Sequence, residues 1–235
     1  MAAMRKLLTV LAALTMLGAT AGLMAGCSSA KKGGPLPDAT TLVKESTTAT
    51  QSLTSAHLVL SVTGTIEKLP LKTLEGDLTN VPATAAKGSA KISLAGSDVD
   101  VKFVVIDGDL YGAISGDDYL DYGPADKIYD VGVILNPDKG LANMLANLTD
   151  PKAEAHETIN GQDTIRVTGK VPADAVNKLA SQLNATEPLP TTVWIQEGGN
   201  HELVQAQIQK SAGNTVQMTL SNWNAPVTVE KPAGA

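Results

Sequence analysis

The sequence predicts an α+β fold, in which one curved antiparallel sheet of many strands is covered on one face by a few helices. Three observations predict it. Apolar and polar residues alternate with a period of two through much of the chain after residue 57, as in strands with one buried face. Turn signals such as Asp107-Gly108 separate these segments. A few other segments have the spacing of amphipathic helices instead.

The first 26 residues have the features of a signal segment. Arg5 and Lys6 form a short basic region, and an apolar run follows from Leu7 to Leu23. A run of this length also suits a transmembrane anchor, which is one alternative. An ordinary cleaved signal peptide followed by an incidental cysteine is another.

Cys27 is the only cysteine of the chain, so an intramolecular disulfide is excluded. The segment Leu23-Met24-Ala25-Gly26-Cys27 resembles the lipobox of bacterial lipoproteins, with Met24 where that motif usually has leucine. The resemblance implies cleavage before Cys27 and a diacylglycerol thioether on its sulfur. We therefore expect a lipid anchor on the outer side of the cell membrane, with a fraction of the protein in the cell wall or secreted.

Residues 27–37 are expected to be the lipidated cysteine and a flexible tether, because their Ser, Gly and Pro content does not pack. Lys31 and Lys32 either contact anionic lipid heads or are simply solvated. The folded domain is expected to be residues 38–235, which is long enough to bury a sizeable core.

The first half of the domain is expected to be one helix followed by strands. The helix runs from Asp38 to Leu53, with Asp38 as its N-cap. Alternation then predicts four strands, at 57–65, 87–94, 98–106 and 110–114.

The middle of the domain is expected to hold two helices around a hairpin. Residues 138–148 carry apolar side chains at i, i+3, i+4 and i+7, and residues 172–184 repeat a similar pattern behind Pro172. The strands 154–158 and 163–168 pair about the turn Asn160-Gly161.

The last third is expected to be a meander of three strands. They are 191–197, 202–210 and 215–221, separated by turns that contain glycine and asparagine. In the second of them Val204, Ala206 and Ile208 alternate with three glutamines, so one face is apolar and the other is wet.

Composition excludes one class of function and permits another. The net charge is −6 and the isoelectric point about 5.0, and no Lys/Arg cluster follows Lys32, so the electrostatic footprint of a nucleic-acid-binding protein is missing. Only 3% of the residues are aromatic, and Phe103 is the single phenylalanine. A core built from small side chains is compatible with a cavity.

The sequence contains none of the common motifs for catalysis or metal binding. His57, His156 and His201 lie far apart in the sequence, and none has a metal-ligand spacing. Neither a nucleophile elbow nor a P-loop is present. The sequence therefore predicts no catalytic residue, no metal, no cofactor and no enzymatic activity.

An acidic cluster is the remaining candidate for a site. Asp117, Asp118 and Asp121 lie beside Tyr119 and Tyr122, but a calcium loop needs more oxygen ligands at fixed spacing. We interpret the segment as a solvated loop. A pocket rim whose tyrosine hydroxyls meet sugar head groups is the alternative.

Several whole segments resemble those of the mycobacterial lipoprotein family that includes LppX, LprA and LprF. The segments are 34–38, 71–78, 135–138 with 140–143, 158–161, 192–195 and 216–220. The resemblance implies a half-barrel sheet closed by helices, similar to the carriers LolA and LolB, around a cavity for acyl chains. It also implies binding of triacylated glycolipids, such as phosphatidylinositol mannosides and lipoarabinomannan, or of triacylglycerol, and work with a membrane efflux transporter.

Two hypotheses follow, a lipid carrier and an envelope structural or adaptor lipoprotein with a solid core; a hydrolase is a distant third. They differ in whether the purified domain holds lipid. If the domain is a carrier, inward-facing residues of the strands and helices should line its cavity. The expected lining is Leu58, Leu60, Val62, Ala90, Ile92, Leu94, Val101, Phe103, Val105, Leu141, Met144, Leu145, Leu148, Val176, Leu179 and Leu183.

Overall fold

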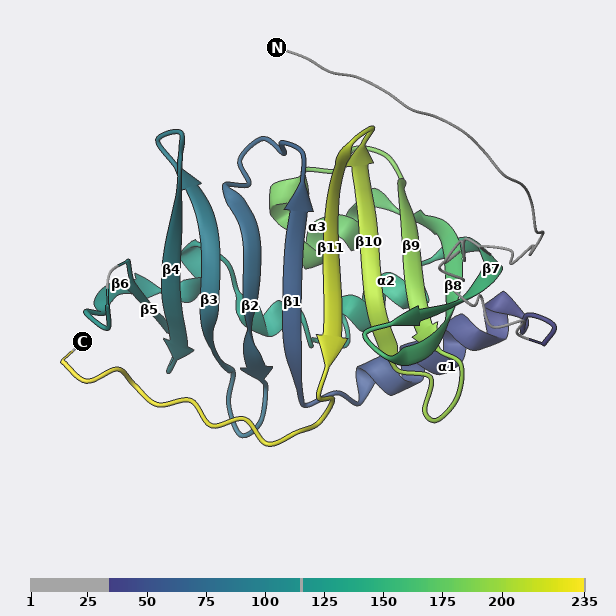
Figure 1. Cartoon of the computed structure of the whole chain (residues 1–235), viewed down its shortest axis with the longest axis horizontal. Coiled ribbons are helices and arrows are strands. Elements are labelled where there is room, and N and C mark those ends of the chain that lie inside the picture. Colours follow the sequence, from purple (N-terminus) through teal and green to yellow (C-terminus); the bar gives the residue numbers. More distant parts are fainter. Residues whose placement is uncertain (1–33, 115, 235) are drawn as a thin grey trace, which may run out of the picture. The chain divides into compact units, whose positions relative to one another are not determined.

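A computed structural model of the chain describes residues 34–114 and 116–234. Its main feature is one sheet of eleven strands in the order β6-β5-β4-β3-β2-β1-β11-β10-β9-β8-β7 (Figure 1). Every neighbouring pair is antiparallel, and β6 and β7 are free edges, so the sheet is open. The large antiparallel sheet that alternation predicts is confirmed.

The strands lie close to their predicted positions where the alternation is strict. Their bounds are β1 Ser55–Thr63, β2 Leu71–Thr79, β3 Ala85–Leu94, β4 Ser97–Ile106, β5 Asp109–Ala113, β6 Leu120–Pro124, β7 Thr149–Ile159, β8 Gln162–Val171, β9 Leu189–Gln196, β10 Leu203–Ser211 and β11 Asn214–Ser221. At the predicted turns, Asp107-Gly108 and Asn160-Gly161 have positive φ at both residues, as type I′ hairpins require.

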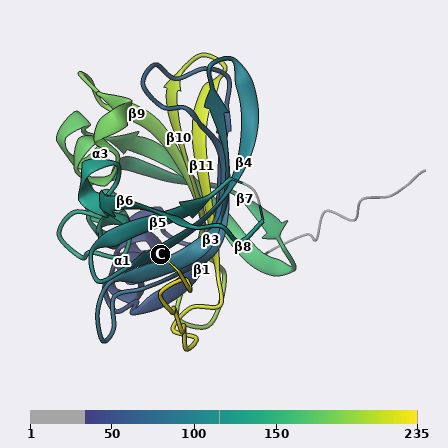
Figure 2. The ribbon, with the colours of Figure 1, turned by 90° about the vertical axis from the view of Figure 1, so that its left-hand side faces the viewer.

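The helices are short and lie on one side of the sheet (Figure 2). They are α1 Ala39–Gln51, α2 Leu141–Ala146 and α3 Ala173–Leu179, with the single 3-10 turns η1 Ala125–Lys127, η2 Val131–Val133 and η3 Ser181–Leu183. No helix of this described part is long and apolar enough to span a bilayer.

The strands β2 and β6 were not predicted from the sequence. In β2 the glycine Gly76 interrupts the alternation, and it lies directly opposite Gly88 of β3. A Cβ on either glycine would collide with the backbone of the facing strand, so the close approach requires both. The short edge strand β6 lies in the segment that we interpreted as a solvated loop.

Both helices in the middle of the domain are shorter than the helices that their apolar patterns predict. The side chain of Asn136 accepts hydrogen bonds from the backbone N–H groups of Asp138 and Lys139, so this stretch forms a turn and α2 begins only at Leu141. The helix predicted over 172–184 ends at Leu179, because Ala180 is extended, with φ −145° and ψ 82°.

The face predicted for β10 needs one correction. The register against β9 shifts between Leu203 and Gln205, so a bulge reverses the alternation at this point. Leu203 joins Ala206 and Ile208 in the main hydrophobic core, whereas Val204 is buried outside that cluster.

The solid part of the core lies under the helices. Leu141, Met144 and Leu145 of α2 and Val176 of α3 are fully buried, together with Ile165 of β8. They belong to one continuous cluster of buried aliphatic side chains that extends along the sheet.

After β11 the chain continues as an extended tail past the lower ends of β1–β4 (Figure 1). The Nζ of Lys87 donates a hydrogen bond of 2.8 Å to the carbonyl of Thr228, and the Nζ of Lys231 lies 5.0 Å from the centre of the Tyr111 ring. These contacts tie the tail to β3 and β5.

Candidate functional site

A cavity of about 410 Å³ lies between the sheet and two short segments that cross it. Its floor is made by strands β1–β4, β10 and β11, and we call residues 128–134 and 179–183 its roof. Lys68 and Ile128 line the cavity and are themselves exposed, so it opens to the surface beside them.

The floor of the cavity follows from strand register. Met218, Leu60 and Leu74 line the cavity and stand opposite one another on β11, β1 and β2. The row continues on the same face of the sheet through Ala90 and Val101, which lie outside the lining. Such a row forms a continuous apolar surface.

The neighbouring row contains glycines, and this leaves space above the sheet. It runs from Leu58 through Gly76 and Gly88 to Phe103. No side chain rises from the two glycines, and Gly76 lines the cavity between Leu58 and Phe103. The hollow therefore has a local cause in the sequence.

Two hydrogen bonds hold the roof together. The part-buried hydroxyl of Tyr129 donates to the carbonyl of Leu179 over 2.9 Å, and Nε2 of Gln182 donates to the carbonyl of Ile128 over 3.3 Å. Burial, and then the charge of Asp130, raise the pKa of Tyr129 well above its usual range, so the hydroxyl remains a donor.

The lining of the cavity is almost entirely aliphatic. Lys68 and Asp77 are its charged residues, and the carboxylate of Asp77 lies 2.8 Å from Nδ1 of His57. Among the described residues no three His, Cys, Asp or Glu side chains are grouped to hold a metal ion. The arrangement suits an apolar or amphiphilic ligand.

The structure brings together some of the residues expected at a cavity and separates others. Those in the lining are Leu58, Leu60, Ile92, Phe103, Leu179 and Leu183. Those in the packed core instead are Val105, Leu141, Met144, Leu145, Leu148 and Val176. Outside the lining and at least partly exposed are Val62, Ala90, Val101 and Leu94, the last with 55% of its surface exposed. Cys27 lies outside the described residues.

Several lining residues were missed by sequence reasoning. The roof contributes Ile128, Tyr129, Val131 and Ile134, from a stretch without a recognised periodicity. The strand β2 contributes Leu74 and Leu78, which were not predicted because the strand itself was not predicted. Ile208 was assigned to the apolar face of the meander, and Val216 and Met218 line the cavity from the next predicted strand, where the same alternation was the available signal.

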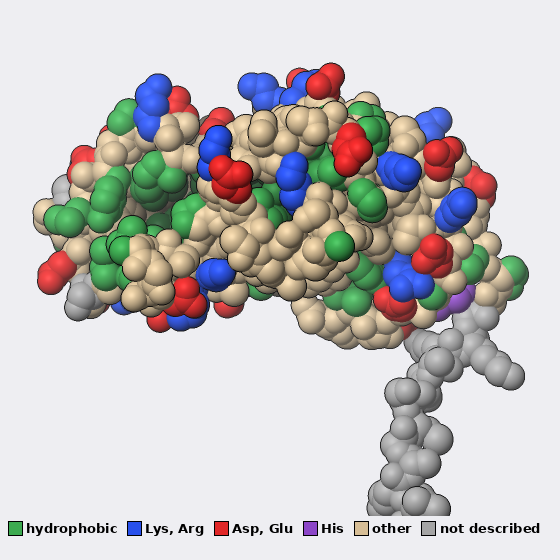
Figure 3. All heavy atoms as spheres, turned by 90° about the horizontal axis from the view of Figure 1, so that it is seen from above, with side chains coloured by type: hydrophobic (Ala, Val, Ile, Leu, Met, Phe, Trp, Pro, Cys, Tyr) green, Lys and Arg blue, Asp and Glu red, His purple; other side chains and the backbone are tan. Residues whose placement is uncertain are grey.

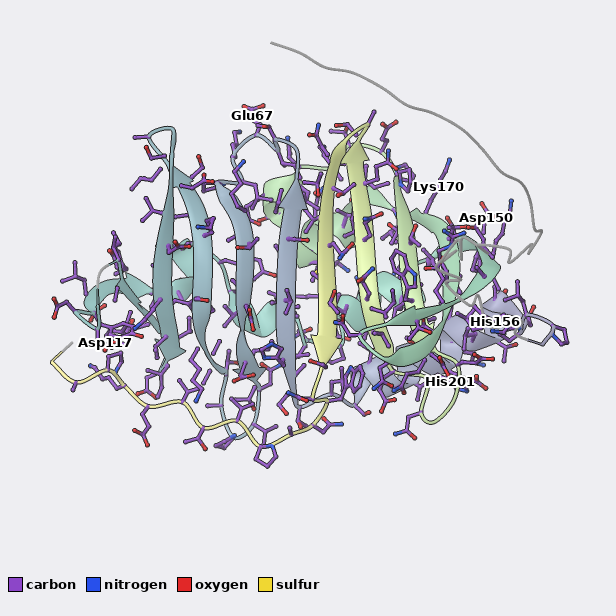
Figure 4. The ribbon with its side chains drawn as sticks, viewed as in Figure 1. Glu67, Asp117, Asp150, His156, Lys170 and His201 are labelled. Atoms are coloured by element: carbon purple, nitrogen blue, oxygen red, sulfur yellow. The ribbon has the colours of Figure 1, made fainter. Side chains whose placement is uncertain are left out.

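The three histidines stay apart in the fold. Nε2 of His156 donates a hydrogen bond of 2.9 Å to the carbonyl of Gly34, and Nε2 of His201 lies 3.5 Å from Glu45. Figure 4 shows both at the β7 end of the sheet, whereas Asp117 lies at the β6 end. The acidic cluster is also separate from the cavity, because neither Tyr119 nor Tyr122 is in the lining.

The chain is similar to proteins of one lipoprotein family. The family model "LppX_LprAFG lipoprotein" matches residues 38–229. The lipoarabinomannan carrier protein LprG of Mycobacterium leprae is 57% identical over 97% of this chain and 96% of its own length. The protein of the same name from Mycobacterium tuberculosis H37Rv is 56% identical over 94% of both chains.

Two solved structures share the fold. LprF from Mycobacterium bovis aligns with a TM-score of 0.77 and 33% identity, over 86% of this chain and 100% of that one. LppX from Mycobacterium tuberculosis aligns with a TM-score of 0.63 and 28% identity, over 81% of this chain and 97% of that one. The expected likeness to LolA and LolB stays a prediction.

Proposed function

Because the chain belongs to the LppX_LprAFG lipoprotein family, we propose that it carries acylated lipids by holding their acyl chains in the cavity. The observation that supports this proposal most is the lining of the cavity. Aliphatic side chains enclose a volume of about 410 Å³, and Lys68 and Asp77 are the charged residues among the described lining. A carrier needs shape and an apolar lining, and it needs no catalytic group.

The energetic reason for a cavity is the cost of acyl chains in water. Each methylene that moves from water into an apolar environment contributes about 0.8 kcal/mol, so ten of them contribute about 8 kcal/mol. The row Met218, Leu60 and Leu74 offers such a chain a continuous apolar floor.

The size of the cavity bears on how a large lipid is held. Its volume is at the lower end of the roughly 300–1,000 Å³ typical of pockets for drug-sized ligands. A lipid with three chains needs additional space. Beyond the lining, Leu94, Ile114 and Leu120 are exposed at the β3–β6 end, and Ile128 of the lining is exposed as well. Figure 3 shows hydrophobic side chains gathered around a hollow at this end.

We propose triacylated glycolipids, such as phosphatidylinositol mannosides and lipoarabinomannan, as the cargo. The names of the relatives from M. leprae and M. tuberculosis support the lipoarabinomannan class. Triacylglycerol as a second cargo and a membrane efflux transporter as a partner are proposed from the family resemblance alone.

The protein is proposed to be anchored through Cys27 to the outer face of the cell membrane. Replacing Cys27 by alanine should move the protein from the detergent phase to the aqueous phase in a phase-partition assay, while its circular dichroism spectrum stays unchanged. The expected change is large, because the anchor consists of two or three acyl chains. A variant that remains in the detergent phase would contradict the anchor.

The function is tested by mass spectrometry of lipids extracted from the Cys27→Ala chain after purification from a mycobacterial host. We expect stoichiometric acylated lipid, with glycolipids enriched over their share of the membrane. An empty protein with a normal melting temperature would favour the adaptor that acts through its surface.

A further inference from the structure

We propose that Lys68 binds the phosphate of a phospholipid cargo at the mouth of the cavity, an inference that rests on the proposed function. Among the residues that the structure describes, Lys68 is the single cation in the cavity lining. Within the described residues, no hydrogen bond or ion pair engages its ammonium group. A free cation beside an apolar hollow matches an amphiphile with a negative head.

The loop that carries Lys68 is held in place. The N–H of Thr65 donates to the side-chain oxygen of Asn214 over 2.9 Å, and the N–H of Leu69 donates to the carbonyl of Ile66 over 3.1 Å. Ile66 itself is buried in the core, and the carbonyl of Pro70 accepts from Ser93 over 2.7 Å. The loop therefore presents Lys68 from a defined position.

The backbone of Lys68 adds a second observation. Its φ of 66° lies in the left-handed region, which a residue with a side chain rarely adopts and which glycine adopts without strain. Eight other non-glycine residues of the described chain share this conformation, most of them in turns, so here it fixes the course of the loop that carries Lys68.

The polar groups around Lys68 leave its charge available. Asp77, the other charged residue of the lining, is bonded to His57, and the amide nitrogen of Gln182 is bonded to the roof. Glu67 precedes Lys68 and is exposed at the tip of the loop (Figure 4). An ammonium group at a fixed point is a common phosphate ligand in proteins.

This placement assigns an orientation to the cargo. Acyl chains that enter between Leu69, Leu71 and Ile128 leave the glycerol and its phosphate at the mouth, next to Lys68. A neutral lipid with the same chains gains nothing from the ammonium group. Lys68 is therefore a specificity-determining residue that favours phosphate-bearing lipids over triacylglycerol or diacylglycerol.

The test compares two lipids with identical acyl chains, dioleoyl phosphatidylinositol and dioleoylglycerol, as competitors of a bound fluorescent acyl probe that carries no charge. The protein is the full chain with Cys27→Ala, alone or with Lys68→Gln. We expect Lys68→Gln to weaken phosphatidylinositol binding about five- to tenfold, a value between those of an exposed ion pair and of a buried hydrogen bond to a charged group. Dioleoylglycerol binding should stay unchanged.

Three controls make the result decisive. Lys68→Arg should retain the preference, and Lys72→Gln, on β2 outside the lining, should leave both affinities unchanged. Inorganic phosphate should not displace phosphatidylinositol, because the acyl chains supply most of the affinity; displacement would contradict a lipid-phosphate site.

Equal loss of both lipids, or no loss of either, in Lys68→Gln would overturn the assignment. If the parent chain binds neither lipid, the proposed carrier function itself is wrong, and the role of Lys68 is wrong with it.

Discussion

Asp38 shows how a single residue sets the start of an element. Its carboxylate accepts hydrogen bonds of 2.8 Å from both the backbone N–H and the hydroxyl of Thr41, so it satisfies one of the free donors at the first turn of α1. The hydrogen bond from the Thr41 backbone, followed by that from its hydroxyl, lowers the pKa of Asp38 below its ordinary value of 3.8.

We predict that Asp38→Ala lowers the melting temperature at pH 7, whereas Asp38→Asn, an equally good cap, lowers it less. Because the pKa is lowered on folding, the carboxylate stabilises the protein above about pH 4, and this contribution is lost as the pH falls through the folded value. Thermal melts between pH 7 and pH 3 should therefore converge for the parent and Asp38→Ala. A constant gap across this range would contradict the cap.

At this scale the sequence predicts which face a residue occupies better than it predicts what the residue touches. Alternation correctly placed Leu60 and Phe103 on the inner face of the sheet. It gave no way to separate Leu183, which lines the cavity, from Leu145, which is in the solid core. That distinction depends on where the roof crosses the sheet, and the roof has no periodic pattern.

At the scale of elements, the roof is the part whose stability most directly affects the cavity. Its two segments, 128–134 and 179–183, are far apart in sequence and are joined by the bond from Tyr129 to Leu179. The raised pKa of Tyr129 means that folding keeps the hydroxyl protonated. The stabilisation that comes from the protonated, hydrogen-bonded hydroxyl is fully present below pH 10, the ordinary pKa of tyrosine. It is lost as the pH rises above that value, because the unfolded chain then gives up the proton more readily than the folded one.

We predict that Tyr129→Phe lowers the free energy of unfolding by about 1 kcal/mol, the typical net value of one hydrogen bond. The bound lipid should also dissociate faster, because the roof opens more easily. Between pH 10 and pH 11 the parent should lose more stability than Tyr129→Phe does. Denaturant titrations and lipid off-rates measure both effects, and Tyr122→Phe, at an exposed tyrosine, is the control.

Elements were predictable where local pattern and tertiary environment agree. The meander β9–β11 and the hairpin β7–β8 were found because apolar and polar residues alternate along most of each strand and turn residues separate the strands. The strand β2 was missed because Gly76 stands where an apolar side chain was expected, and the facing Gly88 that explains it is distant in sequence. Both middle helices were predicted too long, because the turn at Asn136 and the extended Ala180 override an apolar spacing that continues past them.

At the scale of the whole molecule, the helices divide the sheet into two regions. Around α2 and the first turn of α3 the core is solid. Across the sheet, over β1–β4, the glycine row leaves a cavity whose lining includes Ile128, of which 58% is exposed. This division explains how one domain combines a stable fold with room for a ligand. The sequence predicted a single antiparallel sheet, but strand order and the roof depend on contacts between distant segments.

The central claim is that acyl chains occupy the cavity, and Ile92 offers the most direct test. Ile92 lines the floor and is half-buried, whereas Leu94, two residues further along the same strand face, lies outside the lining. A tryptophan added to a packed core costs about 1–3 kcal/mol in strain, whereas in an open cavity it occupies space that a ligand would use.

The measurement is the lipid-to-protein ratio, by mass spectrometry, of Ile92→Trp and Leu94→Trp in the Cys27→Ala chain, with the melting temperature taken on the same preparations. We predict that Ile92→Trp keeps a near-normal melting temperature and loses most of its bound lipid, and that Leu94→Trp retains both. A full lipid load in Ile92→Trp, or a large fall in its melting temperature, would contradict the account.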